Sequence, residues 1–133
     1  MGSGKKREVN GFMKTTQDKA LEIAQLLEDG KGDDVVVLDI SELNSWTDFF
    51  VITTINSSAH WQGLYRQVKD YIKDNDLEIH LTNKKSPDGD DWNLIDLGNI
   101  VVHLMSKQAR AFYDLEKLWH NGKKLKETLN KSY

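Results

Sequence analysis

The sequence predicts an α/β domain in which helices flank a mixed sheet of about five strands. Patterns typical of a helix, two strands, a helix, three strands and a last helix follow one another along the chain. The first two strand patterns, at 35–40 and 49–55, are continuous runs of apolar and β-branched residues, which favour strands covered on both faces. This order of elements requires a sheet that mixes parallel and antiparallel pairs.

Both helices of the N-terminal half have a start signal and an apolar stripe. A threonine hydroxyl and the acidic Asp18 predict that the first helix begins at about residue 16, and it is expected to run to residue 29, just before Gly30. The second helix is expected after the cap at Asn56–Ser58 and should end near Asn75–Asp76.

The C-terminal half reads as three more strands and one long helix. Alternating residues predict a strand at 77–82, and a polar loop follows at 83–91. A β-hairpin is expected up to Met105, with its turn at Leu97–Asn99. The last helix should end at Asn121–Gly122. Its apolar stripe is expected to contain Ala109, Phe112, Leu115, Leu118 and Trp119.

Length and composition indicate one domain. The chain has 133 residues, of which 38% are hydrophobic and 29% charged, and none of its apolar runs approaches the roughly 20 residues that span a bilayer. Residues 1–14 are expected to be a basic, flexible segment whose Met1-Gly-Ser-Gly start is typical of a cloning remnant. Residues 15–122 should form the domain, and residues 123–133 a basic tail, helical at best in part. The cytoplasm is the default compartment, and the lack of cysteine excludes disulfides and thiolate sites.

Charge is distributed unevenly along the chain. Residues 15–106 contain seven basic and seventeen acidic side chains, which gives this body a net charge of −10. Such a body repels phosphate backbones and suits a basic protein as its partner, although a merely solvated acidic face remains the alternative.

Enzyme chemistry finds little support in the residues. The four histidines lie in four different elements without metal-binding spacing, and no G-x-S-x-G motif occurs. The order of elements resembles the nucleotidyltransferase fold, with Asp39 at a strand end. Two-metal phosphoryl transfer needs a pair of carboxylates, and positions 37 and 41 carry none. A nucleotidyltransferase-fold enzyme acting on a nucleotide stays the second hypothesis.

The predicted hairpin and last helix carry the candidate binding residues. Trp92, Leu94 and Asp96 share one strand face, and a tryptophan beside a carboxylate suits protein recognition. His103, within the following strand, is expected to be a core histidine hydrogen-bonded to its surroundings rather than a catalyst. Arg110 and Tyr113, with Glu116 or Lys117, should form a polar stripe on the last helix.

Several spaced motifs together resemble the ribosomal silencing factor, or Iojap-like, family. They are Asp39 in an apolar strand, Asp48-Phe-Phe-Val-Ile, the Asn-Ser-Ser cap, Trp92-x-Leu-Ile-Asp-Leu-Gly, Val-Val-His103 and Arg110-x-x-Tyr113-x-Leu-Glu-x-Leu-Trp119. The resemblance covers about residues 15–120. One departure is the segment Asn83–Gly89, where the family commonly carries Glu-Gly before the tryptophan strand.

The resemblance implies a translational repressor with the α/β fold of nucleotidyltransferases but without their catalytic residues. It implies binding to the large ribosomal subunit through the ribosomal protein of the L-fourteen class, which hinders joining of the small subunit when nutrients are scarce. No cofactor, metal, catalytic residue or membrane contact is implied, while a minor contact with ribosomal RNA and a homodimer away from the ribosome stay open. The partner-binding residues expected on this basis are Trp92, Leu94, Asp96, Leu97, His103, Arg110, Tyr113 and Glu116.

Overall fold

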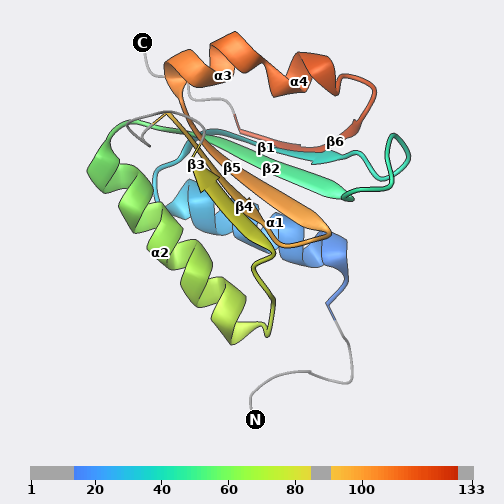
Figure 1. The fold of residues 1–133 in the computed structure, drawn as a ribbon, viewed down its shortest axis with the longest axis horizontal. Coiled ribbons are helices and arrows are strands. Elements are labelled where there is room, and N and C mark those ends of the chain that lie inside the picture. Colours follow the sequence, from blue (N-terminus) through green and yellow to red (C-terminus); the bar gives the residue numbers. More distant parts are fainter. Residues whose placement is uncertain (1–13, 85–90, 129–133) are drawn as a thin grey trace.

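The computed structural model describes residues 14–84 and 91–128. Its sheet has six strands in the order β3-β4-β5-β2-β1-β6, where β2 and β5 run parallel and every other pair is antiparallel (Figure 1). The elements are α1 (Thr16–Asp29), β1 (Asp33–Asp39), β2 (Phe49–Ile55), α2 (Ser58–Asp74), β3 (Leu81–Lys84), β4 (Trp92–Asp96), β5 (Ile100–Ser106), α3 (Lys107–Tyr113), α4 (Leu115–Leu118) and β6 (Lys123–Glu127). The predicted α/β class with a mixed sheet is confirmed.

Capping residues fix the starts of the two long helices. Thr15 accepts a hydrogen bond from the Asp18 backbone N–H, and the Asp18 carboxylate accepts one from the Thr15 N–H, which completes a capping box for α1. At α2 the Ser57 hydroxyl accepts the N–H of His60. Both helices therefore lie where the sequence predicts them.

The sheet is buried on both faces by different helices. Helices α1 and α2 cover one face, and α3 with α4 covers part of the other (Figure 1). Successive side chains of β1 enter opposite layers, so Val35 and Val37 pack toward α1 and α2 while Val36 and Leu38 pack toward α4. The continuous apolar runs thus become strands covered on both faces, as predicted. No helix in the described ranges is long and apolar enough to cross a membrane.

The third strand is shorter than predicted. The sequence predicts a strand at 77–82, but β3 begins only at Leu81. Asp76 adopts a left-handed conformation (φ 55°), and the Leu77 N–H returns to the carbonyl of Ile72. This hydrogen bond is the Schellman arrangement that ends a helix, so Leu77 belongs to the end of α2 and packs partly against the core.

Two predictions about the C-terminal region are wrong. The expected single last helix is divided into α3 and α4 at Asp114, and the expected tail forms β6 at Lys123–Glu127. Strand β6 pairs antiparallel with the otherwise open edge of β1, and just beyond it the Thr128 hydroxyl accepts the Val35 N–H. The final five residues and the N-terminal residues 1–13 lie outside the described ranges.

Candidate functional site

The face of β4 directed toward α3 and α4 carries three of the predicted site residues. Trp92, Leu94 and Asp96 are half-buried, whereas Asn93 and Ile95 are buried on the opposite face. Trp92 and Leu94 pack against the apolar layer beneath α3 and α4. The alternation predicted for this strand is therefore confirmed.

Trp92 joins two further predicted residues into one cluster. Its indole Nε1 donates to Nδ1 of His103 over 3.1 Å, and its ring lies 4.6 Å from the Tyr113 ring. His103 is only 2% exposed and meets the Phe50 ring edge-on at 4.5 Å. Nδ1 of His103 is the acceptor of this bond, because an indole N–H can only donate. His103 thus lies one layer below the surface and supports Trp92 from inside.

Asp96 and Leu97 are placed apart from this cluster. They follow at the other end of β4, where an Asp96 carboxylate oxygen accepts the Gly98 N–H at 2.8 Å and so shapes the β4–β5 turn. Gly98 has φ +90°, which favours glycine. Leu97 packs partly toward the α1 and α2 layer. The structure therefore does not bring these two residues to the Trp92 cluster.

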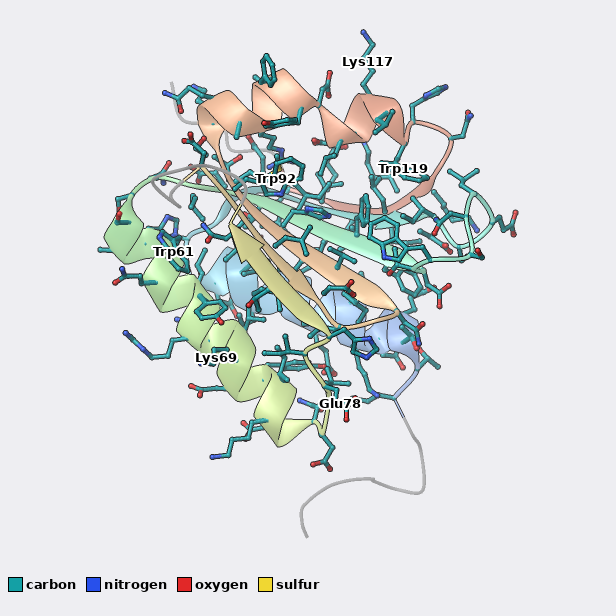
Figure 2. The ribbon with its side chains drawn as sticks, in the orientation of Figure 1. Trp61, Lys69, Glu78, Trp92, Lys117 and Trp119 are labelled. Atoms are coloured by element: carbon teal, nitrogen blue, oxygen red, sulfur yellow. The ribbon has the colours of Figure 1, made fainter. Side chains whose placement is uncertain are left out.

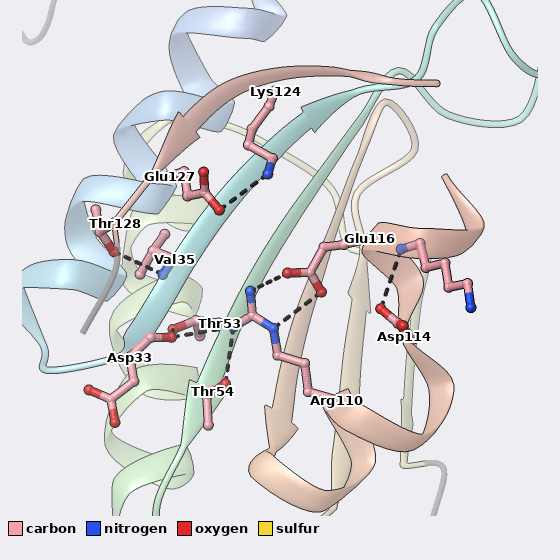
Figure 3. A network of polar contacts seen from close by, with 11 residues as sticks. Asp33, Val35, Thr53, Thr54, Arg110, Asp114, Glu116, Lys124, Glu127 and Thr128 are labelled. Atoms are coloured by element: carbon pink, nitrogen blue, oxygen red, sulfur yellow. Dashed lines mark hydrogen bonds and ion pairs between the residues drawn. The ribbon is translucent and has the colours of Figure 1, made fainter. Parts of the chain in front are cut away.

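Arg110 and Glu116 bind each other and the sheet. The Arg110 guanidinium donates to the Glu116 carboxylate at 2.7 and 3.3 Å and to the Thr54 hydroxyl at 3.0 Å (Figure 3). The predicted polar stripe of Arg110, Tyr113 and Glu116 or Lys117 is wrong, because the helix breaks at Asp114 between these positions.

Sequence reasoning missed several exposed apolar residues. Phe112 is 81% exposed and Leu118 is 69% exposed, although the sequence predicts both on a buried stripe. Figure 2 shows Trp92 beneath α3 and Trp119 below α4. Trp46, on the β1–β2 loop, is also exposed, and its ring touches Phe50. A helix-disfavouring aspartate at position 114 was the one available signal that the stripe would not continue.

Asp39, the candidate carboxylate for phosphoryl transfer, serves a local turn. Its Oδ1 accepts the Ser41 hydroxyl at 2.7 Å and the Ser41 N–H at 3.0 Å, and these bonds hold the pKa of Asp39 below its ordinary value of 3.8. Within the described ranges no three His, Asp or Glu side chains are grouped to hold a metal ion. The geometry of Asp39 therefore gives two-metal chemistry no support.

Comparison with known proteins identifies the family. The family model described as "Ribosomal silencing factor during starvation" matches residues 13–132. A ribosomal silencing factor of Treponema pallidum is 40% identical over 74% of this chain and 87% of its own length. A mouse protein named "Mitochondrial assembly of ribosomal large subunit protein 1" is 31% identical over 73% of this chain and 43% of its own length.

Solved structures agree with the sequence relatives. A crystal structure of a Chromobacterium violaceum protein superposes with a TM-score of 0.72 at 29% identity, covering 90% of this chain and 97% of that one. The resemblance predicted from the Trp92 strand and the Arg110–Trp119 segment is thus confirmed. The chain belongs to the ribosomal silencing factor family.

Proposed function

We propose that this protein represses translation by binding the large ribosomal subunit through the ribosomal protein of the L-fourteen class. Bound there, it hinders joining of the small subunit and lowers protein synthesis under nutrient limitation. Membership of the ribosomal silencing factor family supports a role in ribosome regulation, and the family description itself names starvation. The name of the mouse relative supports the large subunit as the target.

The observation that carries the proposal is an exposed aromatic surface beside β4. We define the docking surface as Trp92, Leu94, Phe112 and Tyr113. Tyr113 is 47% exposed and joins the half-buried Trp92 to the almost fully exposed Phe112, whose ring centroid lies 5.0 Å from that of Tyr113. Aromatic residues dominate the binding energy of protein interfaces, whereas a solvated phenylalanine contributes little to the stability of a free monomer.

Charge favours a basic protein over RNA as the principal partner. The acidic body at 15–106 would attract a basic ribosomal protein and speed association with it. On β6, by contrast, Lys124 pairs with Glu127 and Lys126 pairs with Glu28, each at 3.1 Å. These two lysines are already engaged within the protein, so a contact between β6 and ribosomal RNA would be a minor part of binding.

Sedimentation tests the proposal directly. Purified large subunits are mixed with excess protein, small subunits are added, and the particles are separated on a sucrose gradient. We expect the protein to travel with large subunits and the joined ribosome peak to shrink. Unchanged profiles would contradict the proposal. Binding to large subunits that lack the L-fourteen-class protein would contradict the assignment of that protein as the partner. Sedimentation of the protein alone at several concentrations tests for a homodimer.

A further inference from the structure

A single left-handed residue divides the helical segment that bears the docking surface. Asp114 has φ 47° and ψ 60°, and its N–H donates to the carbonyl of Arg110 at 2.9 Å, which ends α3. The Asp114 carbonyl and carboxylate accept the N–H of Lys117, which starts α4. Leu115 is buried just after the break, while Tyr113 is exposed just before it.

The ion pair between Arg110 and Glu116 depends on this break. In a continuous helix, residues six apart lie about 120° apart around the axis and about 9 Å apart along it. Side chains meet on a helix only at spacings of three or four. The bidentate contact at 2.7 and 3.3 Å therefore exists only because the chain turns at Asp114.

The same guanidinium also fixes the segment to the sheet. Arg110 donates to the Thr54 hydroxyl of β2 at 3.0 Å and to the Asp33 carbonyl of β1 at 3.4 Å (Figure 3). The Arg110 side chain is 11% exposed and that of Glu116 is 29% exposed. The Arg110 charge is directed at Glu116 and at the sheet, and the Glu116 carboxylate binds Arg110, which is poor geometry for reaching a partner.

We propose that Arg110, Asp114 and Glu116 are positioning residues, which hold Phe112 and Tyr113 against Trp92 without themselves supplying the principal contacts. Tyr113 lies three residues beyond Arg110 and one before Asp114, so its ring position is set by the anchored turn. The inference rests on the proposed function only for the binding step, because the placement of the Tyr113 ring on Trp92 belongs to the free protein.

Two substitutions at position 114 isolate the backbone conformation. Asp114→Gly and Asp114→Ala remove the same carboxylate, but only alanine is strained at a positive φ. We expect Asp114→Ala to bind large subunits about tenfold more weakly than Asp114→Gly, and Asp114→Gly to stay within about threefold of the parent protein. Equal binding by the two variants would contradict the proposal.

Substitutions in the ion pair test the anchor. Arg110→Met removes every bond of the guanidinium, and Arg110→Lys keeps the charge but not the planar fork. Both variants should lose the nuclear Overhauser contact between the Tyr113 and Trp92 rings in the free protein and bind at least about fivefold more weakly. Lys124→Met, which removes an exposed ion pair on β6, is the matched control. It should change neither the contact between the Tyr113 and Trp92 rings nor the affinity for large subunits.

The ring contact and the binding assay can fail separately. If the parent protein does not bind large subunits, the proposed function fails, while the ring contact in the variants still decides the positioning role. If the Tyr113–Trp92 contact persists in Arg110→Met and Asp114→Ala, the positioning role is overturned whatever the binding. If Arg110→Met does not fold, the milder substitution Arg110→Lys provides the same test of the ring contact and of binding.

Discussion

The two faces of the sheet are covered in different ways. On one face, α1 and α2 have 14 and 17 residues, and their apolar stripes bury a continuous core. On the other face, α3 and α4 have seven and four residues and leave Phe112, Tyr113 and Leu118 in solvent. The first face is organised for stability, and the second combines stability with the proposed docking surface.

Aromatic contacts show how the second face combines these roles. Ring contacts continue from Phe112 to Tyr113 and Trp92, and then through His103 to Phe50, which lies in the core. Trp46 and Trp119 also pack edge-on against Phe50. Because exposed and buried rings touch in one series, we expect buried residues of this face to contribute mainly to folding and exposed ones mainly to binding.

The largest effect on stability is expected on the fully covered face. Leu27 is 0% exposed in the α1 and α2 core, so Leu27→Ala should lower the free energy of unfolding by about 2–5 kcal/mol. Urea denaturation measures this change. The remaining folded protein should bind large subunits with the parent affinity, and a large loss of affinity would remove the distinction between the two faces.

Trp92→Ala should impair both properties. Its ring packs on Tyr113 and its indole donates to His103, so we expect about 1–3 kcal/mol of lost stability and at least about 2 kcal/mol of lost binding.

Trp92→Phe separates the two contributions of the tryptophan. It keeps a smaller aromatic ring against Tyr113 and removes the indole donor to His103, which should cost about 1 kcal/mol of stability and little binding. Calorimetry with the isolated ribosomal protein measures the affinity. Parent-like binding by Trp92→Ala would exclude Trp92 from the docking surface.

Phe112→Ser is the cleaner test of recognition. The Phe112 side chain is already 81% exposed, so the substitution should change the free energy of unfolding by less than about 0.5 kcal/mol. It should nevertheless weaken binding by at least about 1 kcal/mol. Ile79→Ser, at an exposed apolar residue outside the docking surface, is the matched control and should leave binding unchanged. Equal effects from the two variants would indicate nonspecific apolar contact.

The smallest effect is expected at Tyr71, on the covered face. Burial first, and then its hydrogen bond to the Glu22 carboxylate, raise the pKa of Tyr71 above its ordinary 10.0. The unfolded chain loses this proton at lower pH than the folded one, so stability is full below pH 10 and decreases as pH rises above it. Tyr71→Phe should therefore show a shallower alkaline loss of stability in thermal melts between pH 9 and about 11. An identical slope in both proteins would contradict this assignment.

The sequence by itself determined the elements whose signals are local. The threonine cap and Asp18 mark the start of α1, the apolar runs define β1 and β2, and the alternation in β4 assigns Trp92 and Leu94 to one face. Caps act over three residues and strand alternation over two, so a single sequence contains these signals in full.

Only the tertiary structure decided the features that depend on distant partners. The segment Lys123–Glu127 becomes a strand because β1 has an open edge, and nothing within that lysine-rich segment reveals the edge. The left-handed turn at Asp114 brings Glu116 to the Arg110 guanidinium, which also donates to Thr54 of β2, 56 residues before Arg110 in the chain. A helical pattern cannot indicate that Arg110 and Glu116 meet, because their six-residue spacing places them together only after the helix has broken.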